Sequence, residues 1–536
     1  MHLSMEPPKE DRQELLEIIS GLTSQNEQQG TVIHKLETQN EQLATRLRWF
    51  EEQFHLLRHR QFGKSSERTI AMQGSLFNEA EVVTEQAPAS EDELQSITCE
   101  RRKPGRKPLP QDLPVERIEY DLPEQEKVCP ECGGDMHRMG EAVRKELVVI
   151  PAQAKVREHV RFKYSCRCCE KNNERTPIKE AEAPHPVIAK GYASPSSVAC
   201  VMTMKYVDGV PLYRQEKHFE RLGLKISRSV LSDWAIKGSE WLKFLYLAAK
   251  AILVTRGVLH ADETTLQVLK ELGRAAETKS YMWLYRTGGD DPPIILYEYQ
   301  ETRSGDHPRK FLEGFRGYLH VDGYVGYEGL EHPLKPGDPP PVKLCGCWAH
   351  LRRKFDDAMK GLPASHRGNC RAKEALERIN RLFAIERGLL KCSPEERLAV
   401  RREKSLPEVQ DLRRWMEVIH GELVPKSLMG VAVTYGLNQW DKLVRFLEDG
   451  RVELSNNRAE RSIKPFVIGR KNFLFCNTPG GAQASAIIYS IIETAKENGL
   501  NPHAYLTHLF ERLPNMDTTD AAAIEQLLPW NVILPA

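Results

Sequence analysis

The sequence predicts a multidomain α+β protein, and three observations support this class. A heptad series of apolar residues fills the first 60 residues, two close cysteine pairs fall within 116–185, and helical segments from 186 give way to strand-like segments from 258. At ~100–200 residues per domain, a chain of 536 residues has room for roughly three to five domains. Hydrophobic residues make up 40% and charged residues 28%, which excludes a chain that is disordered throughout.

Apolar runs and cysteines narrow the class further. No run approaches the ~18 apolar residues that a membrane span requires, and Met1–Lys9 lacks the pattern of a signal peptide. We therefore expect no membrane partner, no secretion and reduced cysteines, so that close pairs among the 12 cysteines are metal ligands before disulfides. The net charge of +1 does not decide whether the protein binds nucleic acid, and only local charge can.

Residues 1–60 carry the pattern of a coiled-coil seam. Mostly apolar residues recur at every seventh position from Leu15 to Leu57, and a second heptad series interleaves with them at alternating spacings of four and three. Two asparagines in the second series occupy positions that tend to fix register and strand number. We expect a leucine-zipper-like helix that self-associates into a homo-oligomer, weakened in its middle by Gly30. The alternative is a single amphipathic helix packed on its own protein.

Residues 61–115 are predicted to form a flexible linker that changes from acidic to basic. No Lys or Arg occurs over 69–100, where acidic residues accumulate, and a basic stretch with Pro and Gly follows over 101–108. Such an arm cannot fold, but it can lie along a phosphate backbone or in a minor groove. Its candidate DNA-binding residues are Arg102, Lys103, Arg106 and Lys107. The alternative is a solvated run of charge.

Residues 116–185 are predicted to form a zinc-binding β module. Cysteine pairs lie at 129–132 and 166–169, and two such turns present four thiolates to one tetrahedral ion. Alternating β-branched residues predict strands over 146–150 and 156–164. The predicted ligands of one structural Zn²⁺ are Cys129, Cys132, Cys166 and Cys169, which leaves Cys168 unassigned. Four thiolates leave no open position, which disfavours a catalytic metal; the alternative is unrelated reduced cysteines.

Residues 186–250 are predicted to be helical and to include a helix-turn-helix. Two short helices are expected between 196 and 221, and Gly223 breaks the chain before Ser227, which is a good N-cap for a longer helix over 229–250. This succession fits a helix-turn-helix that binds DNA. Its base-reading residues would be Arg228, Ser229 and Ser232. The alternative is a set of helices that only pack together.

Residues 251–355 change to a strand pattern and contain two aspartates at comparable places. The apolar run from Val258 stops at Asp262, and a later run from Gly317 stops at Asp322. Further strands are expected over 280–286, 293–300 and 342–345, with a helix over 311–315. We expect a mixed sheet whose edge collects carboxylates. For either aspartate alone, the alternative is a turn or a helix cap.

A third acid follows much later in the chain. Asn456 can cap a helix whose first turns hold Glu460, and Lys464 then shares their face by i, i+4 spacing. Pro465 is expected to end or kink that helix. Between 456 and 476 five basic residues accompany this single acid, which suits a divalent cation beside a phosphate. Carboxylates from separate elements can bind a pair of Mg²⁺ ions for phosphoryl displacement, and basic groups neutralise the phosphates.

In this order, the blocks HADETT, HVDGYVGY, CWAHLRRKF and SNNRAERSIKPFVIGRKNFLF resemble the transposases of the insertion sequence 66 family. The resemblance covers nearly the whole chain, including the N-terminal helix, the segment FGKSSE, the arm GRKPLP, the paired cysteines and the block NGLNPHAYL. It implies an RNase H-like α/β catalytic core of the DDE type with a helical insertion. The core would comprise 251–355 and 450–510, the insertion 356–449, and a C-terminal tail 511–536.

The resemblance also implies the site. Asp262, Asp322 and Glu460 fall on the catalytic acids of the family, which would bind two Mg²⁺ or Mn²⁺ ions. The groups that would support DNA phosphates or the developing charge are His350, Arg352, Arg353, Arg461, Lys464, Arg470 and Lys471. Ser455 stands where many relatives carry an Asp, which affects the helix cap and not the metal site.

The activity implied by the resemblance is that of a DNA transposase. It would bind the terminal inverted repeats of its element and release a 3′-hydroxyl, which then attacks target DNA without a covalent enzyme intermediate. Implied partners are DNA, further copies of the chain and small accessory proteins encoded by the same element, in a bacterial cytoplasm. The alternatives are a catalytically silent DNA-binding protein of the same fold and a nuclease that nicks DNA without joining it.

Overall fold

The computed structural model describes residues 9–62, 154–165, 178–289, 292–333 and 340–534. Residues 63–115 of the predicted linker, with its basic arm, and the four predicted zinc ligands lie outside these ranges. The chain divides into two compact units, one of residues 1–87 with 163–536 and one of residues 88–162. Every helix and strand described below belongs to the first unit.

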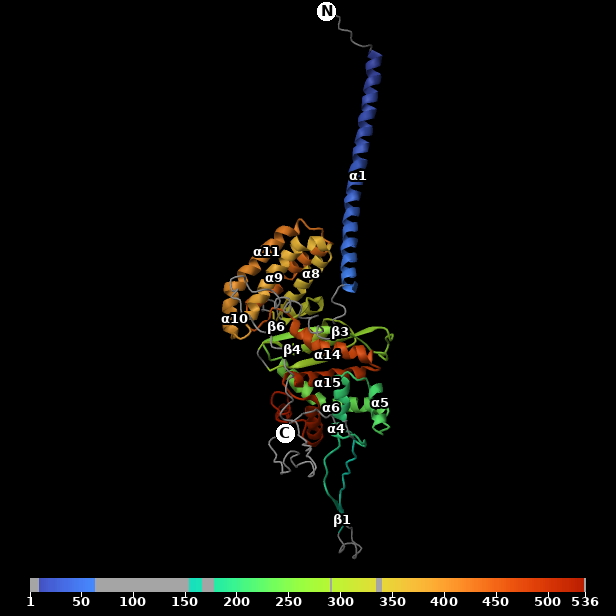
Figure 1. Cartoon of the computed structure of the whole chain (residues 1–536), viewed down its shortest axis with the longest axis vertical. Helices are drawn as coiled ribbons and strands as arrows, with labels where there is room; N and C mark the ends of the chain where they lie inside the picture. The colour runs from blue at the N-terminus through green and yellow to red at the C-terminus, as the bar shows by residue number, and fades with distance from the viewer. Residues whose placement is uncertain (1–8, 63–153, 166–177, 290–291, 334–339, 535–536) are drawn as a thin grey trace, which may run out of the picture. The chain divides into compact units, whose positions relative to one another are not determined.

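The N-terminal segment is one helix, α1 (Lys9–Phe62), drawn in blue in Figure 1. The helix is unbroken at Gly30, so the glycine that we expected to weaken it does not interrupt it. Apolar side chains of the predicted seam are exposed in the single chain, with Leu36 at 53% and Leu43 at 61%. The predicted helix is confirmed, while its self-association stays a prediction.

A small hairpin stands beside the second cysteine pair. Strand β1 (Lys163–Ser165) pairs antiparallel with β2 (Ile178–Glu180). The strand expected over 156–164 is therefore limited to its last residues, because 154–162 carry no regular structure. The hairpin places one strand directly before Cys166, but the cysteine itself lies outside the described residues.

Three helices follow where the capping signals place them. They are α4 (Pro195–Tyr206), α5 (Leu212–Arg221) and α6 (Arg228–Leu253). Gly223 adopts φ +82°, a left-handed conformation that glycine tolerates and that ends α5. Ser227 then caps α6 by accepting a hydrogen bond from the backbone N–H of Val230. The inner faces of α4 and α6 belong to the same hydrophobic core as the sheet.

The central sheet has five strands in the order β5-β4-β3-β6-β7. The strands are β3 (Val258–Gln267), β4 (Lys279–Thr287), β5 (Ile295–Gln300), β6 (Gly317–His320) and β7 (Val342–Cys345). The first three in the chain pair antiparallel, whereas β6 and β7 run parallel to β3. The mixed sheet predicted from the strand pattern is therefore present (Figure 1).

The register of β3 corrects one expectation. Its parallel pairing with β6 ends at His260 opposite His320, but its antiparallel pairing with β4 continues to Gln267 opposite Lys279. Asp262 therefore lies inside a ten-residue strand and not at its end. The apolar run stops there because one neighbouring strand stops.

The short helix between β5 and β6 also differs from the expectation. It is α7 (Asp306–Phe311), so the helix predicted over 311–315 starts and ends earlier. Gly314 with φ +87° breaks the chain in that interval. The turn after β6 contains the 3₁₀ helix η3 (Val325–Glu331).

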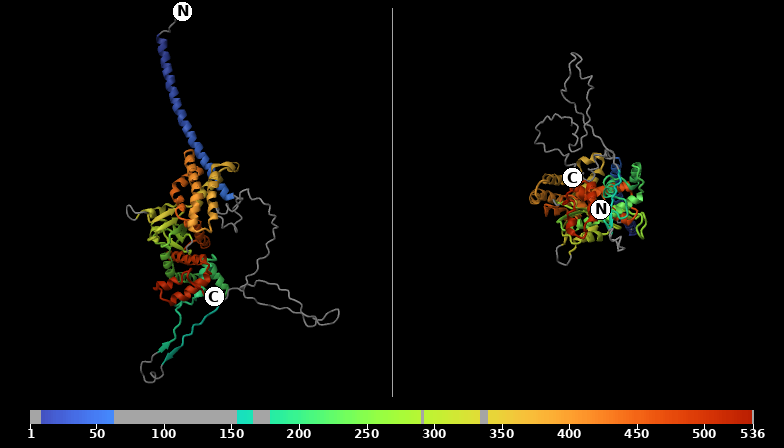
Figure 2. Two further views of the ribbon diagram at one scale, coloured as in Figure 1. Left: turned by 90° about the vertical axis from the view of Figure 1, so that its left-hand side faces the viewer. Right: turned by 90° about the horizontal axis from the view of Figure 1, so that it is seen from below.

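Helix α15 (Pro479–Glu497) covers the outer strand of the sheet. It contacts both β5 and α6 (Figures 1 and 2). Ser490 Oγ accepts a hydrogen bond from Tyr297 N at 2.8 Å, and Thr494 Oγ1 accepts one from Ile295 N at 3.0 Å. These side chains satisfy backbone groups that an open sheet edge would leave unpaired.

The segment between β7 and the later helix α14 (Asn457–Phe473) is helical. Its helices and turns are α8 (Trp348–Lys360), η4 (Ala364–Asn369), α9 (Arg371–Gly388), α10 (Pro394–Val400), the π-helical turn η5 (Arg401–Ser405), α11 (Leu406–His420), α12 (Leu428–Asn438), α13 (Trp440–Leu443) and η6 (Val444–Leu447). They enclose a second hydrophobic core that includes Leu351, Ile379 and Met416. Residues 356–449 contain no strand, as an insertion of helices requires.

Helix α14 (Asn457–Phe473) contacts β3 and carries Glu460. It passes through Pro465, so the proline does not end the helix, and the alternative that it kinks the helix stays a prediction. Phe466 is fully buried just beyond it and Gly469 lies against the Tyr489 ring hydroxyl, and this packing holds the helix despite the missing backbone donor.

The C-terminal elements complete the fold. They are α16 (Pro502–Arg512), which contacts α4, then η7 (Leu513–Asn515) and α17 (Ala521–Glu525). Among the described helices, none is both long enough and apolar enough to cross a membrane.

Candidate active site

Two neighbouring parallel strands place the two aspartates. The parallel pairing of β3 with β6 ends at His260 opposite His320. Asp262 follows His260 by two positions, and Asp322 follows His320 by two. Strand side chains alternate between faces. Because β3 and β6 run parallel, both aspartates lie at the same end of this strand pair. Asp262 Oδ1 accepts a hydrogen bond from Glu263 N at 2.8 Å, and Asp322 Oδ1 accepts one from Tyr324 N at 2.9 Å.

Glu460 reaches this region from the first turn of α14. Its side chain is buried, at 4% exposure. His350 Nδ1 lies 3.6 Å from its Oε1 and Arg353 Nη2 lies 3.7 Å from its Oε2. Within the described part of the chain, neither carboxylate oxygen has a hydrogen-bond partner. A buried acid with free lone pairs requires an explanation.

The pKa values show that the three acids act on one another. The pKa of Asp262 is raised well above its usual value, first by loss of solvent and then by the charges of Glu263, Asp322 and Glu460. Loss of solvent likewise raises the pKa of Glu460 to about 7; the charge of Arg353 opposes this shift and that of Asp322 adds to it. The structure thus brings the three predicted acids into one cluster of like charge. Such a cluster favours protons or metal cations over free carboxylates.

A buried amide ties two of these elements together. Asn456 Nδ2 donates to the carbonyl of Ala261 at 2.9 Å, and its Oδ1 lies 2.9 Å from His260 Nδ1. His260 therefore carries its proton on Nδ1, because Asn456 Oδ1 can only accept. The side chain of Asn456 does not cap α14, which corrects the expected cap. It links the strand of Asp262 to the helix of Glu460 instead.

The two histidines that precede the aspartates stack on each other. The rings of His260 and His320 lie 5.1 Å apart at 4° between their planes. Burial lowers the pKa of His260 to about 4 and that of His320 to about 3. Both rings are therefore neutral at pH 7. They form an uncharged stacked pair, and each ring precedes one of the aspartates by two residues.

Glu263, the neighbour of Asp262, has structural partners. Tyr327 Oη donates to its Oε2 at 2.7 Å, and Arg303 Nε donates to its Oε1 at 2.9 Å. This carboxylate is thereby hydrogen-bonded, whereas Glu460 has only the longer ion pairs to His350 and Arg353. Tyr435 of α12 donates to the backbone carbonyl of Asp322 at 3.2 Å, which joins α12 to the second aspartate.

Some of the predicted basic groups lie at the cluster and others do not. His350 and Arg353 lie beside Glu460. Arg352 is 5% exposed and donates to Asn380 Oδ1 at 2.9 Å inside the insertion.

Arg470 is turned toward β3 instead. It donates to Thr264 Oγ1 at 3.2 Å and to Thr265 Oγ1 at 3.0 Å. Arg461 and Lys471 are exposed and Lys464 is partly buried. The phosphate roles of all these basic residues stay predictions.

The predicted DNA-reading residues of the helical region lie at the start of α6. Arg228 and Ser229 are exposed there, and Ser232 is partly buried. An exposed helix start is compatible with base reading. The basic residues of the arm and the zinc ligands lie outside the described residues.

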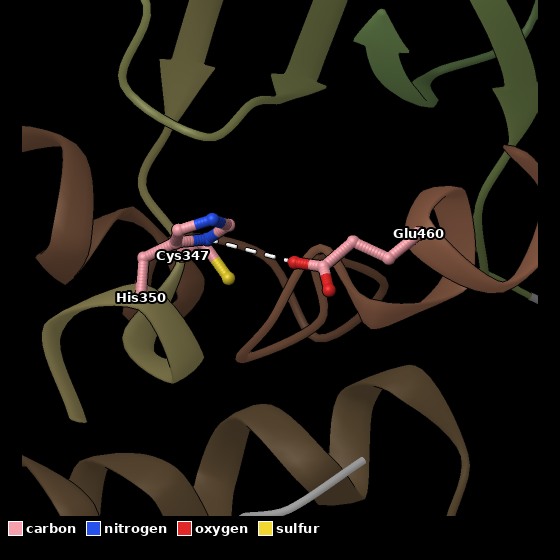
Figure 3. Close-up of side chains that lie close together, drawn as sticks. All are labelled: Cys347, His350 and Glu460. Atoms are coloured by element: carbon pink, nitrogen blue, oxygen red, sulfur yellow. Dashed lines mark ion pairs between the residues drawn. The ribbon is translucent and has the colours of Figure 1, made fainter. Parts of the chain in front are cut away.

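The sequence reasoning missed Cys347. Its Sγ accepts a hydrogen bond from the backbone N–H of Asn456 at 3.1 Å, and it faces His350 and Glu460 (Figure 3). The signal was present as a Cys-x-x-His spacing where β7 passes into α8. The sequence also carried a signal for the two stacked histidines, since His-x-Asp occurs at both aspartates.

The donor atoms of the acid cluster fit a hard divalent cation. Asp262, Asp322 and Glu460 offer only carboxylate oxygens, which suit Mg²⁺ and Mn²⁺. The pKa values of Asp262 and Glu460 are raised first by burial and then by neighbouring acids, and a cation would stabilise both carboxylates against each effect.

Residues 190–484 match the family model described as "Transposase IS66 family". The chain belongs to this family of transposases. Residues 126–170 match the zinc-finger binding domain of transposase IS66, and residues 490–530 match the IS66 C-terminal element. Residues 49–118 match a model described as "Transposase C of IS166 homeodomain". The family predicted from the motif blocks is confirmed.

Three curated relatives of this IS66-family transposase come from Sinorhizobium fredii. Uncharacterized protein y4hP is 32% identical over 90% of this chain and 88% of the relative. Uncharacterized protein y4jD is 32% identical over 79% of this chain and 81% of the relative. Uncharacterized protein y4qI is 34% identical over 80% of this chain and 78% of the relative. The likeness therefore extends over most of each protein.

Proposed function

We propose that this IS66-family chain is a metal-dependent DDE-type transposase. It binds the terminal inverted repeats of its insertion sequence, cleaves a DNA strand there and joins the new end to target DNA. The observation that carries the proposal is that the charges of Asp322 and Glu460 reach Asp262 and the charge of Asp322 reaches Glu460, although the three acids come from β3, the end of β6 and α14. Three acids from separate elements form the donor set that phosphoryl transfer with divalent cations requires.

The strand order supports an RNase H-like core as the scaffold. Three antiparallel strands are followed by two strands parallel to the first. In this assignment the first acid lies on the central strand and the second after its parallel neighbour. The third acid lies on a helix that follows the helical insertion. The insertion would then separate the last acid from the others in sequence but not in space.

Asp262, Asp322 and Glu460 would hold a pair of Mg²⁺ or Mn²⁺ ions. When bound, such ions lower the pKa of the attacking hydroxyl and neutralise charge on the leaving oxygen. The side chain of Arg353 is 39% exposed beside Glu460, so its guanidinium can contact a DNA phosphate. The contacts of Asn456 with His260 and with the Ala261 carbonyl hold the start of α14 against β3. They thereby fix the spacing of two of the acids.

The DNA-binding surface would include the start of α6, with Arg228 and Ser229, and the basic arm of 101–108. The exposed apolar side chains of α1 support a homo-oligomer formed through that helix. One structural Zn²⁺ would occupy the cysteine pairs, which lie within the residues matched by the zinc-finger model. Accessory proteins of the same element and a bacterial cytoplasm remain proposals from the resemblance.

The test uses Asp262→Asn, Asp322→Asn and Glu460→Gln in the full chain, with Asp449→Asn as the control. Asp449 is ion-paired with Arg451 and is no part of the acid cluster. Each of the three variants should bind inverted-repeat DNA like the wild type but yield no cleaved or joined strands with Mg²⁺ or Mn²⁺. Asp449→Asn should keep both activities.

Three outcomes contradict the proposal in different ways. Joined products from any of the three acid variants would refute the assignment of the acids. Nicked but never joined DNA from the wild type would indicate a nuclease of the same fold. Tight binding without cleavage under all metal conditions would indicate a catalytically silent DNA-binding protein.

A further inference from the structure

Glu460 of the acid cluster also lies close to two side chains of different chemistry, Cys347 and His350. Cys347 Sγ, one ring nitrogen of His350 and a carboxylate oxygen of Glu460 all lie within 4.8 Å of one another, and Figure 3 shows them facing a common point. We propose that they bind a thiophilic divalent cation such as Zn²⁺, which draws Glu460 away from Asp262 and Asp322. The inhibitory consequence rests on the proposed function, whereas the binding does not.

The distances suit a tetrahedral ion. Zn–N and Zn–O bonds of about 2.0–2.1 Å at the tetrahedral angle separate two ligand atoms by about 3.3 Å. His350 Nδ1 and Glu460 Oε1 already lie 3.6 Å apart. This pair therefore needs only a small adjustment, Cys347 Sγ lies within 4.8 Å of both atoms, and the fourth position remains for solvent.

Unsatisfied lone pairs supply an independent reason for a ligand. Among the described residues, His350 Nδ1 and both carboxylate oxygens of Glu460 are buried without a hydrogen-bond partner. Burying such atoms costs about 1–3 kcal/mol each when nothing replaces the lost water. A cation would satisfy the Nδ1 lone pair and one carboxylate oxygen together.

Burial raises the pKa of the Cys347 thiol to about 12, and the surrounding backbone groups offset part of this shift. The residue directly precedes α8, and its Sγ accepts the N–H of Asn456 at 3.1 Å. A helix N-terminus and backbone donors both stabilise negative sulfur. On binding, the S–H bond breaks, the metal–sulfur bond forms, and the proton passes to solvent.

Ligand chemistry separates this site from the two others in the protein. Sulfur and imidazole select Zn²⁺ over Mg²⁺, whereas the carboxylates of the acid cluster select Mg²⁺ or Mn²⁺. The two cations share Glu460 as a ligand, so they compete for it. None of the three side chains belongs to the cysteine pairs of the predicted zinc module.

The positive charge of Arg353 opposes the binding of a cation at this site. Its Nη2 lies 3.7 Å from Glu460 Oε2, and its positive charge must move aside when a metal ion binds. Replacing Arg353 by Gln removes that charge while keeping a polar side chain. Arg353→Gln should therefore tighten Zn²⁺ binding several-fold, an effect that a purely structural cluster would not show.

The test measures the binding of Co²⁺, a spectroscopic substitute for Zn²⁺, to the full chain. A weak chelator first leaves one equivalent of zinc, that of the predicted zinc module. The wild type should bind one equivalent of Co²⁺ with a thiolate charge-transfer band. Loss of a ligand should weaken this binding by at least about 100-fold, beyond the 10–100-fold cost of disturbing an outer shell. Two variants remove ligands, Cys347→Ser and His350→Gln. The control is Cys392→Ser, because Cys392 is a free cysteine outside the cluster.

The outcomes separate this inference from the proposed function. A missing band, or a band that survives both Cys347→Ser and His350→Gln, would overturn the site. If Cys347→Ser does not fold, His350→Gln decides, since that side chain is 24% exposed. Zn²⁺ should also inhibit Mg²⁺-dependent cleavage by the wild type, and less in Cys347→Ser. A Co²⁺ band without any cleavage would support the site and refute the transposase activity alone.

Discussion

Replacing Asn456 by Ala tests how the strand of Asp262 is held to the helix of Glu460. The side chain is fully buried and makes two contacts of 2.9 Å, to His260 Nδ1 and to the Ala261 carbonyl. Alanine leaves both partners unsatisfied at about 1–3 kcal/mol each. We therefore expect a loss of about 2–6 kcal/mol in the free energy of unfolding.

The same change should reduce catalysis beyond its effect on stability. Misplacing a reacting group by about 1 Å can cost about 100-fold in rate, and Asn456→Ala frees the start of α14 from β3. The control is Asn498→Ala, which also removes two hydrogen bonds, to the carbonyls of Pro293 and Thr494 at 2.8 Å each, but away from the acids.

The assay compares thermal unfolding with single-turnover cleavage of inverted-repeat DNA, at a temperature where both variants remain folded. Both variants should lose stability, and only Asn456→Ala should lose most of its cleavage rate. Equal cleavage rates for the two variants would refute the positioning role of this amide.

Three further predictions concern a buried carboxylate, a crowded glycine and a predicted zinc ligand. Burial raises the pKa of Glu298 from 4.5 to about 7, so the folded state binds the extra proton and stability falls as pH rises between these values; Glu298→Gln should remove up to roughly 3 kcal/mol of that loss, seen as a higher Tm than wild type at pH 8 but not at pH 4. Gly469→Ala should destabilise by about 1–3 kcal/mol, because its Cβ would lie 2.2 Å from Tyr489 Oη, whereas Gly480→Ala, with nothing within 4 Å, should unfold near the wild-type temperature. Cys129→Ser should lower bound zinc by one equivalent in metal analysis, and unchanged zinc would contradict the predicted ligand set.

Local signals in the sequence were sufficient for much of the fold. Ser227 and Gly223 delimit α6 and the turn before it because capping and left-handed glycine are properties of a few consecutive residues. The five strands were likewise recognisable from their apolar and β-branched patterns. By contrast, the true length of β3 depends on β4, whose pairing extends beyond Asp262 and which no local pattern reveals.

The candidate site was predictable in its acids but not in its surroundings. The motif blocks single out Asp262 and Glu460, yet no spacing shows which neighbours are paired. Arg352 and Arg470 looked equivalent to Arg353 in sequence, but their side chains bond to the insertion and to β3. Such partners are set by packing between distant segments. For the same reason Pro465 did not end its helix.

Helix α15 has a consequence for incomplete chains. Its Ser490 and Thr494 occupy the backbone groups of β5, and its apolar face fills the core between sheet and α6. A ribosome that stops early, or a frameshift upstream of Pro479, would release a polypeptide whose outermost strand is bare. Bare strands recruit one another, so truncated copies of the gene should yield insoluble product and not a smaller working protein.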